Sequence, residues 1–103
     1  MAWHSSINAE ELSEGDVCGI TIGEIQIALY KIDGTIFATS NICTHDYALL
    51  SDGYLEGDYI ECPLHAAVFH VPTGKVHDGP TNCALKTFPV KLEDGMIMVE
   101  IAA

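Results

Sequence analysis

The sequence predicts an all-β protein, and three observations support that prediction. Apolar residues recur with a period near two in segments such as 25–30 and 96–101. Asp33-Gly34 and Asp94-Gly95 interrupt such segments, and Asp-Gly pairs favour the positive φ angles of tight hairpin turns. No segment sustains the 3.6-residue period of a helix, and no internal repeat is present. A length of 103 residues fits one domain over residues 1–103.

The first third of the chain contains the clearest strand signals. Asn8 followed by Glu11 predicts a capped helical segment of one or two turns at most, and His4 before it is expected in a frayed end. Residues 17–22 and 25–30 are expected as strands on either side of a turn at 23–24.

The last part of the chain repeats the hairpin pattern. Residues 88–92 and 96–101 are expected as strands that flank a turn at 93–95. Because proline has no backbone N–H, Pro89 predicts an edge position or a bulge within the first of these strands.

Residues of about 41–80 differ from both flanks. They contain three of the four prolines and two of the four cysteines, with short expected strands at 59–61 and 68–70. Apolar periodicity is weak in this stretch, and a metal centre can stabilise a segment that lacks a large core of its own. We therefore expect a subdomain built from loops around a bound group.

The charge balance restricts the partners. Fifteen acidic residues face four lysines and no arginine, which gives a formal net charge of -11. Phosphate contacts need lysine and arginine, so we expect no nucleic-acid binding and no attraction to anionic membranes. Basic protein surfaces are the better electrostatic match.

The sequence also predicts a cytoplasmic location. The first residues have neither the basic nor the apolar region of a signal peptide, and no apolar run approaches the roughly twenty residues of a membrane span. In a reducing compartment, cysteines serve as metal ligands or buried thiols more often than as disulfides.

Two cysteine–histidine pairs are the main chemical signal. Cys43-Thr44-His45 and Cys62-Pro63-Leu64-His65 each combine one thiolate with one imidazole, and sixteen residues separate the pairs. Tetrahedral zinc accepts two cysteines and two histidines, although zinc fingers usually place both cysteines first. A mononuclear site that mixes one pair from each loop is a second, less favoured reading. A 2Fe–2S cluster with two thiolates on one iron and two imidazoles on the other is the third.

The pattern Cys43-x-His45-x16-Cys62-x2-His65 resembles the Rieske signature. The similarity covers nearly the whole chain and is greatest to the small Rieske ferredoxins of multicomponent aromatic-ring-hydroxylating dioxygenases. The runs that carry it further are Ser51 to Gly57, Ile60 to His65 and Thr73-Gly74-Lys75. The resemblance implies a Rieske fold, in which the flanking strands form a base of antiparallel sheets and residues of about 41–80 form a loop-built cluster-binding subdomain.

The resemblance also implies the site residues. Cys43 and Cys62 would hold one iron, and His45 and His65 would hold the outer iron of one Rieske-type 2Fe–2S cluster per chain. Gly79-Pro80 matches the loop that shields the cluster in this family.

The implied function is a one-electron carrier rather than an enzyme, with no catalytic residues of its own. Electrons would come from an NADH-dependent flavoprotein ferredoxin reductase and pass to a terminal oxygenase that hydroxylates aromatic rings. Two alternatives remain at this point, namely a Rieske-type small subunit of another oxidoreductase such as nitrite reductase, and a zinc-stabilised interaction module.

The loop residues predict a reduction potential in the lower part of the Rieske range of roughly −150 to +300 mV. High-potential members of the family carry an extra cysteine in each ligand loop and a nearby hydroxyl donor. The chain has Leu64 at one of these loop positions and Ala66-Ala67-Val68 where the hydroxyl would stand. Fewer hydrogen bonds to sulfur stabilise the reduced cluster less.

Several other residues near the predicted site, or with a sulfur or nitrogen donor, are not expected to be ligands. Ala67 and His70 stand where the family often has glycine and aspartate. His70 and His77 are expected at the surface or behind the ligands, not as ligands. Cys18 and Cys83 lack a histidine at ligand spacing and are expected as small buried hydrophobic residues.

Overall fold

The computed structural model describes residues 2–42, 48–63, 67–79 and 84–101. The predicted all-β class is confirmed, because these described residues form eleven strands and two short 3-10 helices, with no α-helix among them. Neither of the two described helices is long and apolar enough to cross a membrane. All strand pairs are antiparallel, and they build three sheets.

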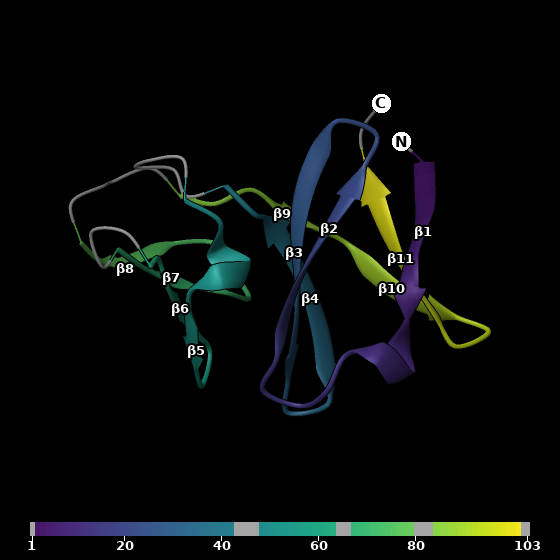
Figure 1. Cartoon of the computed structure of the whole chain (residues 1–103), viewed down its shortest axis with the longest axis horizontal. Helices are drawn as coiled ribbons and strands as arrows, with labels where there is room; N and C mark the ends of the chain where they lie inside the picture. The colour runs from purple at the N-terminus through teal and green to yellow at the C-terminus, as the bar shows by residue number, and fades with distance from the viewer. Residues whose placement is uncertain (1, 43–47, 64–66, 80–83, 102–103) are drawn as a thin grey trace.

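The three sheets lie side by side as layers (Figure 1). The terminal sheet has the order β1-β11-β10, with bounds Ala2–Asn8, Met96–Ile101 and Val90–Glu93. The central sheet has the order β2-β3-β4-β9, with bounds Val17–Ile22, Ile25–Ile32, Thr35–Ser40 and Thr87–Phe88. The small sheet has the order β5-β6-β7-β8, with bounds Tyr54–Glu56, Tyr59–Glu61, Val68–His70 and Val76–Asp78. The 3-10 helices are η1 (Ala9–Glu11) and η2 (Leu50–Asp52).

Both predicted Asp-Gly hairpins are confirmed. Asp33 and Gly34 have φ angles of 49° and 77°, and Asp94 and Gly95 have 53° and 79°. Two consecutive positive φ angles match the right-handed twist of the paired strands, which explains why aspartate and glycine occupy these positions. The turn expected at Gly23 also forms, with a φ of 61° at that residue.

The N-terminal segment is partly as predicted. Asn8 caps η1, since its side chain accepts the N–H of Glu10 at 3.0 Å while the Glu11 carboxylate accepts the N–H of Asn8 at 3.3 Å. The expected fraying at His4 is wrong, because His4 lies in β1 opposite Val99. Pairing with a strand near the other end of the sequence holds this segment in place.

Pro89 divides the strand expected at 88–92. The residue before it ends β9 in the central sheet, and the residue after it begins β10 in the terminal sheet. Both strands are sheet edges, as the missing N–H requires. The Pro89 carbonyl remains paired by accepting the N–H of Glu100 at 3.0 Å. The proline thus marks the passage of the chain from one sheet to the next.

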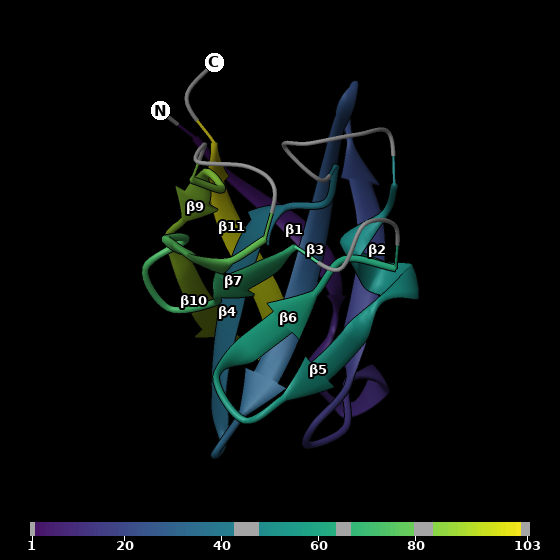
Figure 2. The same ribbon diagram turned by 90° about the vertical axis from the view of Figure 1, so that its left-hand side faces the viewer.

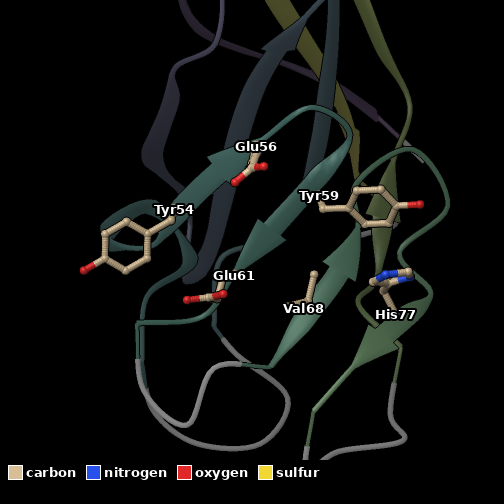
Figure 3. A pocket seen from close by; sticks show the side chains of 6 residues that line it. All are labelled: Tyr54, Glu56, Tyr59, Glu61, Val68 and His77. Carbon is tan, nitrogen blue, oxygen red and sulfur yellow. The ribbon is translucent and has the colours of Figure 1, made fainter.

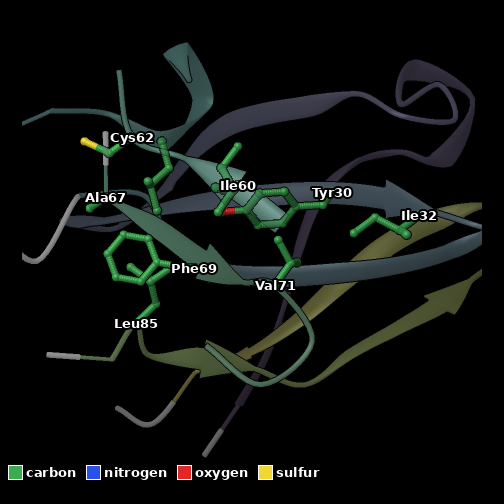
Figure 4. Close-up of a cluster of buried hydrophobic side chains, with 10 residues drawn as sticks. Tyr30, Ile32, Ile60, Cys62, Ala67, Phe69, Val71 and Leu85 are labelled. Atoms are coloured by element: carbon green, nitrogen blue, oxygen red, sulfur yellow. The ribbon is translucent and has the colours of Figure 1, made fainter. Parts of the chain in front are cut away.

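The middle of β3, in the central sheet, is buried on both faces. Ile27, Ala28, Leu29 and Tyr30 of β3 are each 0% exposed. Ile27 and Leu29 belong to the terminal core, which fills the space beside the terminal sheet and consists of Leu12, Ile27, Leu29, Ala38, Phe88, Ile97, Val99 and Ile101. Ala28 and Tyr30 belong to the small-sheet core, which consists of Ala28, Tyr30, Ile32, Leu50, Ile60, Cys62, Ala67, Phe69, Val71 and Leu85 (Figure 4).

A short chain of hydrogen bonds links β3 to β4 on the face of the central sheet that carries Ala28 and Tyr30. The Thr39 hydroxyl donates to the Ser40 carbonyl at 2.9 Å, so the Tyr30 hydroxyl, 2.8 Å from Thr39 Oγ1, is the donor to Thr39. Burial raises the pKa of Tyr30 well above its ordinary value.

Candidate metal centre

Of the four predicted ligands, Cys62 falls within the described residues, whereas Cys43, His45 and His65 lie outside them. Cys62 follows β6 directly and is 1% exposed. It lies at the same end of the small-sheet core as Ala67, far from Ile32 at the other end (Figure 4). A buried thiol at the edge of an apolar core is a suitable donor for an iron–sulfur group, which is shielded from water in proteins.

One hydrogen bond between Cys62 and Ala67 closes the base of the second ligand loop. The N–H of Cys62 donates to the carbonyl of Ala67 at 2.7 Å. This bond extends the pairing of β6 with β7 by one step beyond Glu61 and Val68. The backbone therefore leaves the small sheet at Cys62 and rejoins it at Ala67.

Asn41 closes the base of the first ligand loop. Its carbonyl accepts the N–H of Leu50 at 2.7 Å, and its Oδ1 accepts the N–H of Ser51 at 2.8 Å. Its Nδ2 donates to Ser51 Oγ at 3.0 Å, and Ile42 pairs with Leu49 in an isolated bridge. The sequence did not indicate this role of Asn41, although a short amide side chain just before a loop often forms hydrogen bonds with nearby backbone groups.

Gly79 begins the third loop, which matches the cluster-shielding loop of the family. It lies against Ala67, where the second ligand loop ends. A methyl group placed on Gly79 would lie 2.6 Å from the Cα of Ala67, and its φ of +118° is itself unfavourable for other residues. Close approach therefore requires glycine here. Farther along, the N–H of Leu85 donates to the carbonyl of Gly74 at 2.7 Å and ties down the returning chain.

Ala67 was noted as a departure from the glycine that the family often carries. Its side chain is fully buried in the small-sheet core, and the neighbouring space is left free by Gly79. The methyl group is thus accommodated by packing, and it adds apolar surface next to Cys62.

The flanks of all three loops meet in one core. Ala48 packs against it and Leu50 belongs to it after the first loop, Cys62 and Ala67 border the second, and Leu85 follows the third. Figure 2 views the molecule with the small sheet in front of the central sheet. Buried Cys62 therefore lies where this core ends. The predicted donor set of two thiolates and two imidazoles is the one that suits a mixed-ligand 2Fe–2S group.

The remaining histidines occupy positions consistent with non-ligand roles. His70 Nδ1 lies 2.8 Å from Thr73 Oγ1, and its Nε2 lies 3.9 Å from an Asp58 carboxylate oxygen. His77 is exposed, with its ring 4.5 Å from that of Tyr59. Within the described ranges, no group of three or more His, Cys, Asp or Glu side chains gathers into a metal site.

The other two cysteines were expected to be buried. Cys18 is only half-buried, in a strand at the edge of the central sheet, and packs against the terminal core, so that expectation is wrong for this residue. Cys83 lies outside the described residues.

Comparisons with known proteins agree with this construction. The model of the Rieske [2Fe-2S] domain matches residues 2–89. The ferredoxin component of the naphthalene 1,2-dioxygenase system of Pseudomonas putida is 45% identical over 100 residues, which cover 97% of this chain and 96% of that protein.

Two solved structures have the same fold. The ferredoxin of Sphingomonas yanoikuyae B1 superposes with a TM-score of 0.93 at 32% identity, covering 98% of this chain and 100% of that one. The complex of reduced oxygenase and oxidized ferredoxin in carbazole 1,9a-dioxygenase contains a chain that superposes with a TM-score of 0.89 at 34% identity, covering 94% of this chain and 91% of that one.

Proposed function

This chain belongs to the Rieske [2Fe-2S] domain family, and on that premise we propose that it carries single electrons from an NADH-dependent flavoprotein reductase to a terminal oxygenase that hydroxylates aromatic rings. The similarity to a ferredoxin component over 97% of the chain is the observation that carries this proposal. The protein is therefore an electron-transfer component and not the catalyst of the oxygenation.

The proposed ligands are Cys43 and Cys62 on one iron and His45 and His65 on the other. When bound, a Rieske 2Fe–2S group supplies reversible one-electron transfer at a potential set by its ligands and their hydrogen bonds. Buried Cys62 and the adjoining small-sheet core supply the dry inner side of such a centre. The cluster-binding subdomain of about residues 41–80 is part of this proposal.

The chain's own residues contribute rigidity around that centre. Asn41 fixes the base of the first loop with three hydrogen bonds, and Cys62 with Ala67 fixes the base of the second. Rigid support keeps ligands in one geometry, which limits the reorganisation that accompanies a change of charge. The fold thus favours fast electron exchange over substrate chemistry.

The two alternatives are less well supported. The relatives are named as ferredoxin components, which does not favour a small subunit of nitrite reductase. A zinc-stabilised module would use the same four side chains, but the Rieske family match favours iron. A cytoplasmic location also belongs to the proposal, since an NADH-dependent reductase draws on a cytoplasmic reductant.

Electron paramagnetic resonance of the purified protein before and after dithionite reduction tests the cofactor. We expect no signal from the oxidised protein, whose two ferric irons are coupled, and a signal with a low average g value after reduction. Stoichiometric zinc in a colourless protein would instead support the interaction module. A brown protein that an oxygenase cannot reoxidise would contradict the carrier function while leaving the cofactor in place.

A His65→Cys variant tests the ligand assignment. Thiolate in place of neutral imidazole should lower the reduction potential toward the roughly −400 mV of all-cysteine ferredoxins. His4→Cys, in β1 of the terminal sheet, is the matched control and should leave the potential unchanged. An unchanged potential in a cluster-loaded His65→Cys protein would contradict the assignment of His65.

A further inference from the structure

The small sheet has a second face that faces away from the core. Ile60 and Phe69 belong to the small-sheet core and Leu55 packs against it. Because side chains alternate along a strand, their neighbours lie on the opposite face. Together with a residue of β8, these neighbours line a shallow pocket of about 240 Å³, formed by Tyr54, Glu56, Tyr59, Glu61, Val68 and His77 (Figure 3).

Carboxylates and aromatic rings alternate in this pocket. The register places Tyr54 of β5 opposite Glu61 of β6, and Glu56 of β5 opposite Tyr59 of β6. Each glutamate therefore has a tyrosine directly across the strand pair, and the two glutamates lie at diagonal corners. Side chains that are opposite or diagonal on one sheet face are close enough to contact one ligand group together.

The negative charge of the pocket is not neutralised within the described part of the chain. Residues 52–61 carry four acidic side chains and no basic one. Neither Glu56 nor Glu61 forms an ion pair with a described residue, whereas Asp58 outside the pocket lies 3.9 Å from His70. A cation from another molecule would therefore meet two uncompensated carboxylates.

The aromatic rings are unusually available. Tyr54 is 67% exposed and Tyr59 is 37% exposed. The centroid of the Tyr59 ring lies 5.3 Å from that of His70 and 4.5 Å from that of His77, so neighbouring rings restrict its side chain before any ligand arrives. A preordered ring loses little conformational freedom on binding.

We infer that this pocket receives an arginine or lysine side chain from the surface of the terminal oxygenase. Carboxylates bind such cations through charge-assisted hydrogen bonds, and tyrosine faces attract them through cation–π interaction. The pocket is smaller than typical sites for organic ligands, and it fits one side chain. We infer an oxygenase as the partner because a solved structure of similar fold shows a ferredoxin in complex with an oxygenase. This inference rests on the proposed function.

The pocket lies next to the residues that flank the second ligand loop. Glu61 directly precedes Cys62, and Val68 directly follows Ala67, so the pocket borders the base of the second ligand loop. A cation held there would bring the partner surface alongside the proposed cluster. The net charge of -11 would attract the partner from a distance, and the pocket would fix its orientation.

Substitutions in the holoprotein test the inference. Glu56→Gln removes one charge of the pocket, and Tyr54→Ala removes one exposed ring. Glu24→Gln in the β2–β3 turn and Leu92→Ala in β10 are matched controls, since both positions are exposed and belong to other sheets. The affinities for the reductase and for an oxygenase that the wild-type protein reduces are measured at low and high salt, together with the rates of electron transfer from the reductase and to the oxygenase. The reduction potential of each variant shows whether the cluster is intact.

Glu56→Gln and Tyr54→Ala should each weaken binding to the oxygenase by about three- to tenfold, with the charge effect shrinking at high salt. Both controls should stay within about twofold of the wild type. Equal affinities for Glu56→Gln and Glu24→Gln would overturn the inference and leave the carrier function standing. A loss confined to the reductase would overturn the choice of partner. A wild-type protein that reduces no oxygenase would instead overturn the proposed function.

Discussion

The small sheet and the central sheet achieve order in different ways. Strands β2, β3 and β4 of the central sheet have six to eight residues each, and tight turns join them. The small sheet has four strands of three residues. A two-residue turn joins β5 to β6, but the next two connections span residues 62–67, where the second ligand loop lies, and residues 71–75. The central sheet contributes to two cores, whereas the small sheet shares one core with it.

This difference shows that the small sheet depends on its surroundings. Its core includes Ala28, Tyr30 and Ile32, all supplied by β3. Isolated sheets of such short strands have too few contacts to be stable in water. We therefore attribute the order of the small sheet to packing on β3 and to the proposed cluster, and five predictions test that view.

The largest expected effect is loss of the cluster. Cys62→Ser should abolish cluster binding and lower the free energy of local opening in β6 and β7 by roughly 3 kcal/mol or more, while β3 and β11 keep theirs. Hydrogen exchange of backbone amides measures both regions in one experiment. Cys18→Ser in β2 is the control. Equal loss of protection in all sheets would show that the two regions are one cooperative unit.

The next comparison removes one large side chain from each core. Phe69→Ala and Ile97→Ala should cost about 3–5 and 2–5 kcal/mol of unfolding free energy, since both residues are fully buried. The Phe69 variant should also alter the paramagnetic signal of the reduced protein, because Phe69 shares a core with Cys62. The Ile97 variant should not. Denaturant unfolding gives the free energies, and a changed signal in the Ile97 variant would contradict the separation.

Alanine substitutions at Gly34 and Gly79 separate the cost of backbone strain from the cost of a steric clash. Gly34→Ala meets nothing within 4 Å of its new methyl group, so we expect a cost of about 1 kcal/mol from the positive φ. Gly79→Ala adds a clash with Ala67 to the same kind of strain, and we expect about 2–3 kcal/mol. Thermal unfolding of the two variants at one pH measures the difference. Equal costs would mean that the backbone at Ala67 moves freely.

The smallest effect concerns Tyr30, the residue that joins the central sheet to the small-sheet core. Tyr30→Phe removes one buried hydrogen bond, which should cost about 1 kcal/mol near neutral pH.

The same residue predicts the alkaline behaviour. Burial raises the pKa of folded Tyr30, so the unfolded chain loses this proton first. Stability should therefore fall as the pH rises above about 10, by up to roughly 1.4 kcal/mol per pH unit. Tyr30→Phe should lack this part of the slope, and parallel slopes in urea titrations would contradict it.

Local signals made much of the fold predictable. Asp33-Gly34 and Asp94-Gly95 fixed two hairpins because their turns demand positive φ angles. The pairing of β1 with β11 joins residues about 95 apart in the sequence, as in the register of Ala2 with Ile101, and no local pattern encodes it. All four strands of the small sheet have three residues; the two inner ones, β6 and β7, were predicted, whereas the edge strands β5 and β8 were not.

The chemistry of the site was more predictable than its support. The spacing of Cys43, His45, Cys62 and His65 indicated the class of centre, and the Rieske family match agrees with it. The ligand assignment itself stays a prediction. The contacts of Asn41 with Ser51 and of Gly79 with Ala67 close loops of about ten residues, and no motif in the sequence indicated how those loops close.

The two-sided burial of β3 also bears on how this protein can vary or be engineered. Ile27 and Leu29 serve the terminal core, and Ala28 and Tyr30 serve the core beside the proposed cluster. Alternate positions of one strand are therefore open to separate selection. Substitutions at Ile27 and Leu29 should change the stability of the terminal core, and substitutions at Ala28 and Tyr30 should change the packing beside the proposed cluster.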